Sequence, residues 1–426
     1  MVKKIMGKGL LSIIAFYAFF LSPLIVLAEV PEVKANTTQN VAIFDDVWSK
    51  VNGNFYDPKF NGVDWFAMRT KYSDMAEQAK NIDELEKVIN QMLSELKTSN
   101  TRFYTKDFPD YYNILDTCRI PSVIDEVKKM FPEGRVSYTG IGIFTKIING
   151  KEFISAVLER GPAHRAGLQI GDQIISVDGA PYHPVKSFIG KAETAVKIKI
   201  QPTADSASAK EVVVTPIDIK PKEIFWDAMK GSIKVIEREG IRIGYIHIWS
   251  YYGEQYYQLL MSEIAYGRLA GADALIIDLR NGWGGANPYY LNIFHKNVPV
   301  ITQIDREGVT TVMDYQWRRP VAMLVNEDTH GGDEIITYGF KKYGLGKITG
   351  SKTAGAVMSS RPFILRDGNL LNIAVANMLV DGERLEGKGV TPDIDINMPI
   401  EYANGKDAQM DWAINILFAE VMNRQK

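Results

Sequence analysis

The chain of 426 residues is 46% hydrophobic and 23% charged, and its formal net charge is −2. This length is enough for two or three globular domains with separate cores. The balanced charge gives no electrostatic reason to expect nucleic acid or an anionic membrane surface as a partner. Cys118 is the single cysteine, which excludes an intramolecular disulfide.

The first 28 residues have the layout of a signal peptide. Lysines precede an apolar run from Leu10 to Ala28, and Val26 and Ala28 supply the small-residue pattern that a signal peptidase reads. An uncleaved anchor is the alternative, because about 19 apolar residues can just span a bilayer. The interruption at Pro23 favours cleavage, and no cysteine directly follows the run, which excludes a lipoprotein anchor. We expect an exported protein, periplasmic or extracellular, with anchoring near the membrane as the alternative.

Residues 38–105 are predicted to form a small helical unit, preceded by a loose polar stretch from Glu32 to Asn40. Its clearest helix is IDELEKVINQMLSELKTS, where apolar residues recur at helical spacing and form one face. Asn81 is the predicted N-cap of this helix and Glu84 its capping-box partner. The apolar face comprises Leu85, Val88, Ile89, Met92, Leu93 and Leu96, and weaker helical periodicity covers residues 41–52 and 64–79.

Residues 135–218 are predicted to form a compact module dominated by β-strands. Short runs rich in β-branched residues alternate with glycine and proline, as in IGIFTKI, EFISAVL and AVKIKIQ. The polar segment 204–210 is expected to be a loop or the end of a hairpin.

Two motifs within this module indicate a binding role. Gly140, Ile141, Gly142 and Ile143 precede the first strand, where glycines let backbone N–H groups turn toward a bound carboxylate. The segment GPAHRAGLQIGDQIISVDG, residues 161–179, places turn glycines on both sides of a short helix. Together these motifs resemble a PDZ domain, which implies that a peptide adds as an extra strand and that the loop holds its C-terminal carboxylate. A purely structural hairpin is the alternative.

From residue 225 to residue 400 the pattern changes to strands that alternate with helices. Helices that cross between apolar strands predict a parallel or mixed sheet covered on both faces, and residues 401–426 are expected to add a C-terminal helix. The predicted strands are RIGYIHIW, ADALIIDLR, VAMLVN and KITGSKT, and the predicted helices are GEQYYQLLMSEIAYGRLA, NPYYLNIFHK and DEIITYGFKKYG.

A glycine cluster follows one of these strands, in ADALIIDLRNGWGG, residues 272–285. The strand ends near Asp278 and Arg280, and a helix follows the glycines. A phosphate loop does not fit, because no Lys-Ser/Thr pair follows and the glycines lack dinucleotide-binding spacing. The backbone amides of Gly284 and Gly285 are instead candidates for half of an oxyanion hole.

The motif LEGKGVTPDIDI, residues 385–396, completes a recognisable set. Together with DLRNGWGG and the intervening PDZ-like module, it resembles the C-terminal-processing (tail-specific) serine protease family. The segment GLGKITGSKTAGA, residues 344–356, is closer to the tricorn-core branch. The resemblance covers about residues 38–400 and implies an α/β and β multidomain fold: a helical unit, a PDZ-like β module and an α/β sandwich core.

This sequence departs from the family at the catalytic positions that the resemblance implies. The nucleophilic serine stands three residues before an acidic residue that opens a helix; that residue is Glu334, so the position holds Gly331. The general-base lysine of one branch corresponds to Ala356. The histidine of the other branch, in a Ser-His-Thr context, corresponds to Asn100.

Other positions implied by the resemblance do match. Ser99 stands beside the substituted histidine position, and Glu386 occupies the place of the glutamate that one branch uses. Gly332, with Gly284 and Gly285, completes the expected oxyanion set.

Nucleophilic catalysis needs a hydroxyl or thiol beside a base that accepts its proton. Glycine has no side chain, alanine has no reactive group, and an asparagine amide is not basic near neutral pH. Loss of one member of a working triad already lowers turnover by several orders of magnitude. We therefore expect impaired catalysis. Thr329 and His330 are the alternative nucleophile and base, but neighbours in an extended or turn segment point their side chains apart, which favours a role in loop contacts.

Two functions follow as hypotheses. The first is an exported, non-catalytic homologue that binds peptide or unfolded-protein C-termini through the PDZ-like loop and the glycine-lined groove. The second is an active serine endopeptidase that processes extracytoplasmic proteins near their C-termini with a relocated nucleophile. The histidines show no metal-ligand spacing, so neither a metal nor a cofactor is expected, and the sequence does not indicate an oligomeric state.

Overall fold

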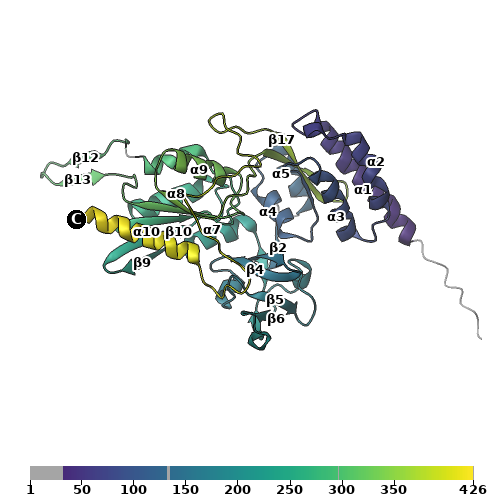
Figure 1. Ribbon diagram of the computed structural model, residues 1–426, viewed down its shortest axis with the longest axis horizontal. Helices are drawn as coiled ribbons and strands as arrows, with labels where there is room; N and C mark the ends of the chain where they lie inside the picture. Colours follow the sequence, from purple (N-terminus) through teal and green to yellow (C-terminus); the bar gives the residue numbers. More distant parts are fainter. Residues whose placement is uncertain (1–31, 132–134, 296, 426) are drawn as a thin grey trace, which may run out of the picture.

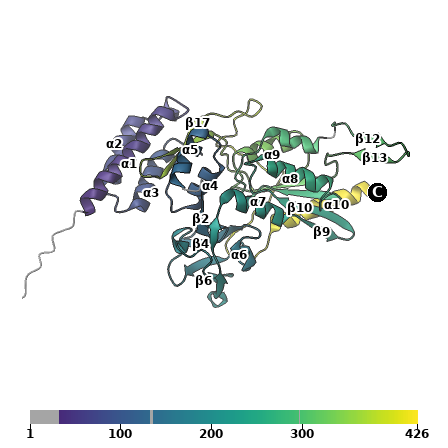
Figure 2. The ribbon, with the colours of Figure 1, turned by 180° about the vertical axis from the view of Figure 1, so that it is seen from behind.

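The structure is a computed structural model that describes residues 32–131, 135–295 and 297–425 (Figure 1). A group of helices lies at one end, an α/β core at the other, and a small β module packs beside both (Figures 1 and 2). The predicted fold class is confirmed. The predicted signal peptide lies outside the described residues. Within the described part of the chain, no helix has the length and apolar character needed to cross a bilayer.

Three helices form the N-terminal unit, and the first begins earlier than predicted. The stretch from Glu32 to Asn40 is helical and not loose, since it contains no glycine or proline to interrupt the helix. The Asn81 cap is as predicted, because its Oδ1 accepts from the Glu84 N–H at 2.9 Å, although the Glu84 carboxylate accepts from the Lys80 N–H. The helices are α1 (Glu32–Asn54), α2 (Trp65–Glu77) and α3 (Ile82–Ser94).

Strands from distant parts of the chain close this unit. Strand β1 (Arg102–Tyr104) pairs antiparallel with β17 (Leu370–Ala376), which pairs with β16 (Ser359–Ile364). Phe103 lies opposite Leu371 in a shared hydrophobic cluster. As a result, the residues just before β1 lie beside the core. Two helices that the sequence pattern did not predict pack nearby, α4 (Pro109–Thr117) and α5 (Pro121–Met130).

The β module is a five-stranded antiparallel sheet in the order β3-β4-β5-β6-β7. At the turn after β5, Asp178 and Gly179 both have positive φ, and Val177 bridges Ala180. The strands are β3 (Ile143–Ile148), β4 (Lys151–Val157), β5 (Gln173–Val177), β6 (Val196–Gln201) and β7 (Lys210–Val214), with α6 (Pro162–Arg165) between β4 and β5 and the short pair β2 (Tyr138–Gly140) and β8 (Ile217–Ile219) beside them.

The core is a six-stranded sheet in the order β18-β15-β14-β11-β10-β9, parallel except for the β9–β10 pair. Its central strands are continuously apolar because helices cover both faces (Figure 1). Helices α7, α8 and α9 pack on one face and α10 on the other. The bounds are β9 (Lys234–Arg238), β10 (Ile241–His247), β11 (Ala274–Asp278), β14 (Val321–Val325), β15 (Lys347–Gly350), β18 (Ile394–Asp395), α7 (Pro221–Ser232), α8 (Glu254–Ala265), α9 (Gly332–Lys342) and α10 (Ala408–Gln425).

Two features of the core differ from the sequence prediction. The segment predicted as a helix after the glycine cluster is a 3₁₀-helix, η4 (Pro288–Phe294). A two-stranded hairpin, β12 (Ile301–Ile304) with β13 (Thr310–Met313), projects beyond the body of the core (Figure 1).

Candidate active site

The turn between β14 and α9 is the centre of the candidate site. Gly331, the position of the absent serine, has φ 65° and ψ −128°, a conformation that L-residues rarely adopt. Its N–H donates to the Ala356 carbonyl at 2.9 Å. A strained strand-to-helix turn is the geometry that lifts a nucleophile out of a sheet edge. The backbone at Gly331 therefore has the shape of such a turn, and the residue there carries no side chain.

Space for a side chain remains at this turn. A Cβ built on Gly331 would meet only the Cα of Gly284, at 3.8 Å. The glycine is thus not required by close packing, and the missing atoms leave a gap in the wall of the site.

Thr329 and His330 do not form a nucleophile and base pair. The Thr329 hydroxyl is fully buried; it donates to the Leu279 carbonyl at 2.9 Å and accepts from the Asn326 N–H at 3.0 Å. The His330 ring bonds through Nδ1 to the Asp328 carbonyl and lines the cavity beside the turn. The two side chains face different surroundings, which is the loop role that the sequence favoured.

Ser99 and Glu386 come together across 287 positions of sequence. The Glu386 carboxylate accepts from the Ser99 N–H at 2.8 Å, from the Ser99 hydroxyl at 3.0 Å and from the Val357 N–H at 3.0 Å. Asn100 follows Ser99 and donates through Nδ2 to the Met358 carbonyl at 2.7 Å. The side chain at the histidine position is therefore tied to the wall of the site and has no free basic atom.

Glu334 fixes the segment that contains Ala356. Its buried carboxylate accepts from the N–H groups of Gly355 and Ala356, at 2.7 and 2.6 Å, and from the Thr353 hydroxyl at 2.6 Å. Burial raises the Glu334 pKa, and these hydrogen bonds oppose that shift. Since Ala356 presents only a methyl group, the lysine function of the other branch is absent as well.

The predicted oxyanion set needs one correction. The Gly284 N–H donates to Asp333 Oδ2 at 3.0 Å, so it is not available to a ligand. The N–H groups of Gly285 and Gly332 have no acceptor among the described residues, and both glycines are half-buried. Two donors without an acceptor in the described part of the chain therefore remain, and Gly284 packs closely against the backbone of His330 and Gly332.

Most of these positions line a single cavity of about 610 Å³. Ser99, Ala356 and Glu386 lie behind its wall and hold it through the bonds described above. The predicted residues on the surface of the cavity are Asn100, Gly284, Gly285, Gly331 and Gly332. A concave, largely pre-formed site with a few polar groups is suited to binding a ligand.

The predicted carboxylate loop of the β module is not open in this arrangement. Gly140, Ile141, Gly142 and Ile143 are all buried. A Cβ at Gly142 would lie 3.3 Å from the Ile224 side chain, because helix α7 covers the loop. Peptide binding at this loop stays a prediction, and in this arrangement α7 packs against the loop.

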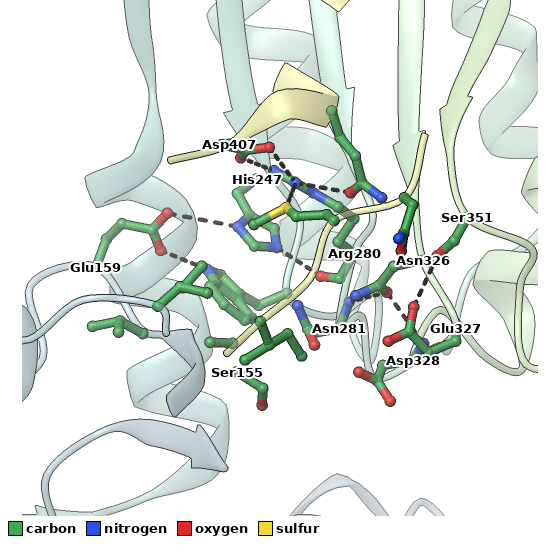
Figure 3. Close-up of a pocket in the computed structure, with 18 of the residues that line it drawn as sticks. Ser155, Glu159, His247, Arg280, Asn281, Asn326, Glu327, Asp328, Ser351 and Asp407 are labelled. Carbon is green, nitrogen blue, oxygen red and sulfur yellow. Dashed lines mark hydrogen bonds and ion pairs between the residues drawn. The ribbon is translucent and has the colours of Figure 1, made fainter. Parts of the chain in front are cut away.

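A second, polar cavity of about 350 Å³ lies where the β module meets the core sheet (Figure 3). The Glu159 carboxylate accepts from the Trp249 indole at 2.6 Å and lies 3.6 Å from His247 Nδ1, while His247 Nε2 bonds to the Arg280 carbonyl at 2.8 Å. Burial lowers the pKa of His247, but nearby Asp278 and Glu159 outweigh it and raise the pKa overall. This network joins the module to the core.

The same cavity contains an ion cluster that the sequence analysis did not find. Arg280, 8% exposed, donates to both Asp278 and Asp407. Burial alone would raise the Asp278 pKa, but Arg280 and His247 hold it at about 2. The end of β11 is therefore tied to the segment that leads into α10. Asp278 and Arg280 were visible as charges at the end of an apolar strand, but their partner 127 residues later was not.

Three family models match segments of this chain. The model for peptidase family S41 matches residues 242–396, the Tricorn protease C1 domain matches residues 39–94 and the PDZ domain matches residues 153–200. These segments correspond to the α/β core, the N-terminal helices and the centre of the β module.

Individual proteins agree with these matches. The chain is 26% identical over 398 residues to putative tricorn protease homolog 2 of Streptomyces coelicolor, covering 88% of this chain and 32% of the relative. It is 25% identical over 421 residues to the carboxyl-terminal-processing protease of Synechocystis sp., covering 94% of this chain and 92% of the relative. A crystal structure of the tricorn protease matches with a TM-score of 0.54 at 21% identity, covering 91% of this chain and 37% of that chain, which supports the fold alone.

The strained turn predicts a measurable cost for any side chain at position 331. Gly331→Ala should lower the free energy of unfolding by about 1–3 kcal/mol, because φ 65° and ψ −128° are unfavourable for an L-residue even where space exists. Chemical denaturation measures this cost. Gly53→Ala in α1 is the control, since nothing lies within 4 Å of its Cβ and its φ is not positive. An unchanged free energy of unfolding for Gly331→Ala would show that the turn is not strained.

The buried Asp333 predicts a pH-dependent stability. Burial raises its pKa to about 8, against the lowering effect of the Gly284 N–H, while Oδ1 has no partner. The folded state therefore retains a proton that the unfolded state releases near pH 4, and stability falls by up to about 1.4 kcal/mol per pH unit until pH 8. Asp333→Asn keeps a neutral group of the same shape. Between pH 6 and 8, thermal unfolding should show a smaller loss of stability for this variant than for the wild-type protein. Parallel curves of stability against pH for the two proteins would refute the assignment of the pH dependence to Asp333.

Proposed function

Given that this chain belongs to the carboxyl-terminal-processing serine protease family and carries a PDZ domain, we propose that it is a catalytically impaired member that binds polypeptide C-termini. The main observation behind this proposal is Gly331, which offers no atom that could attack a peptide bond, although the rest of the site is formed. Asn100 and Ala356 add to it, since neither branch's base is present. The relatives are named as peptidases, but those names describe the relatives and assign no activity to this chain.

The hydrogen bonds that hold the site in shape are present, which favours a binding role over a site that has lost its structure. The Glu386–Ser99 contact, the Glu334 contacts and the two free amides surround a cavity that an extended polypeptide can enter. Binding needs these donors and the cavity shape, but it does not need a nucleophile. We further propose export, on the basis of the N-terminal leader pattern. N-terminal sequencing of the mature protein from producing cells tests this, and a retained leader in a cytosolic fraction would refute it.

Restoration of the missing groups tests the proposal. Wild-type protein incubated with unfolded polypeptides should give no cleavage products by mass spectrometry. Gly331→Ser combined with Asn100→His should give detectable hydrolysis, because Ser99 and Glu386 are already in contact behind the restored histidine. Gly331→Ala combined with Asn100→His is the matched control and should remain inactive.

The alternative, an active endopeptidase with a relocated nucleophile, makes the opposite prediction. Cleavage by the wild-type protein that Thr329→Ala abolishes would replace the present proposal. A fluorophosphonate adduct on any hydroxyl of the wild-type protein would do the same.

The covered PDZ loop predicts that tail binding at this loop is limited by domain docking. Phe144 of β3 stacks against Phe225 and Trp249 of the core, at 6.5 and 6.1 Å between ring centroids. It belongs to the cluster of the core and not to that of the module. Phe144→Ala should therefore favour an arrangement in which the β module has moved away from α7. It should strengthen peptide binding at the loop roughly two- to tenfold.

Fluorescence anisotropy with a labelled peptide that has a free carboxylate measures this effect. Ile147→Ala is the control on the same strand, because Ile147 is 74% exposed and lies away from the core. Equal or weaker binding by Phe144→Ala, with the module still folded, would contradict docking as the limiting step.

A further inference from the structure

Arg119 gives the cavity around Gly331 an unneutralised positive charge. Its side chain is exposed, lines the cavity and lies 5.9 Å from the ring centroid of Tyr252. It makes no ion pair with any carboxylate in the described part of the chain. The acidic residue on the cavity wall, Asp110, is half-buried, and burial raises its pKa, which disfavours its negative charge. The electrostatics of the cavity therefore favour an anion.

Two glycines that line the same cavity have backbone donors without an acceptor among the described residues. These donors are the N–H groups of Gly285 and Gly332, and Gly332 begins the eleven-residue helix α9. The N-terminus of a helix attracts negative charge through its unpaired N–H groups and its dipole. Gly285 lies against the backbone of Tyr252, which also carries Arg119 over its ring. The amides and the guanidinium are thus parts of one region.

An unpaired acceptor adds a second requirement on the ligand. Asn372 lines the cavity, is 7% exposed, and its Oδ1 has no hydrogen-bond partner among the described residues. Its Nδ2 donates to the Asn100 carbonyl at 3.2 Å. An unsatisfied buried acceptor is costly and is relieved by a ligand that supplies an N–H group. A simple anion cannot satisfy it.

The cavity wall also has an apolar part, and at about 610 Å³ the cavity is much larger than a small ion. The ligand must therefore combine a carboxylate, an N–H group and an apolar body. The C-terminal residue of a polypeptide has all three. The apolar lining residues are Ile114, Ile120, Trp283, Ile335, Val357 and Met358.

We propose that this cavity binds the C-terminal residue of a polypeptide, with its α-carboxylate between Arg119 and the amides of Gly285 and Gly332. The absence of a side chain at Gly331 leaves room for the carboxylate beside the turn. This inference rests on the proposed function and assigns it a carboxylate site separate from the PDZ loop. Arg119 determines specificity for a free terminus over an internal segment.

Photo-cross-linking locates the bound tail. The probe is an unstructured peptide that ends in a free carboxylate and carries a diazirine in its penultimate residue; the comparison peptide has a C-terminal amide. Cross-links should map to residues 118–120, 283–286 and 330–332, and the amide should reduce them. Arg119→Gln should weaken this labelling by about tenfold, as expected for loss of a charge-assisted hydrogen bond, and Arg119→Lys should restore part of it.

Arg306→Gln is the matched control. Arg306 does not line the cavity; it lies in the turn of the β12–β13 hairpin, which projects beyond the body of the core (Figure 1), and its loss should leave labelling unchanged. Cross-links confined to residues 140–143 would overturn the cavity site but support tail binding by the PDZ domain. Equal cavity labelling by the amide peptide would overturn the carboxylate assignment. Absence of any binding, to cavity or loop, would overturn the proposed function itself.

Discussion

The geometry of the site depends on the short connection between β14 and α9, which three buried side chains hold in place. Thr329 bonds to the carbonyl of Leu279, Asp333 accepts from the amide of Gly284, and Glu334 accepts from the amide of Ala356. Each bond joins the turn to a different segment of chain. Because these side chains are fully buried, loss of one partner leaves an unsatisfied polar group at a cost of about 1–3 kcal/mol. The position of the Gly331 backbone is thus fixed by contacts of neighbouring residues and does not depend on a side chain at position 331.

These contacts explain how the turn keeps its shape with a glycine at position 331. Glu386 accepts from both the N–H and the hydroxyl of Ser99, which fixes the backbone just before Asn100. Asn100 uses its amide to bond the Met358 carbonyl, which completes the wall. In the same way Gly331 lowers the conformational strain of the turn. The residues at these positions are therefore compatible with the fold and contribute to it.

Sequence patterns predicted the elements that depend on local spacing. The face of α3 and the apolar strands β11 and β14 follow directly from periodicity and burial on two sides. Within the site, the family motif located Gly331, Asn100 and Glu386, which the structure brings together. The direction of the Gly284 amide could not be predicted, because it depends on Asp333, 49 residues later. The contacts of Glu159 with Trp249 and of Arg280 with Asp407 likewise join different parts of the fold, and no local pattern specifies them.

Because the β module is docked on the core, the PDZ loop and the cavity at Gly331 are not equally accessible to a polypeptide terminus. Lys146 bonds Glu327 and Asp328 across this interface, but such partly exposed pairs contribute only about 0–1 kcal/mol. The packing of Phe144 on the core and the partly buried Glu159–Trp249 contact also hold the module against the core. Since both lie beside the loop that α7 covers, a tail can reach that loop only after they separate. The cavity at Gly331 carries no such requirement. In this arrangement, it follows that an incoming polypeptide terminus meets the cavity at Gly331 before it meets the PDZ loop.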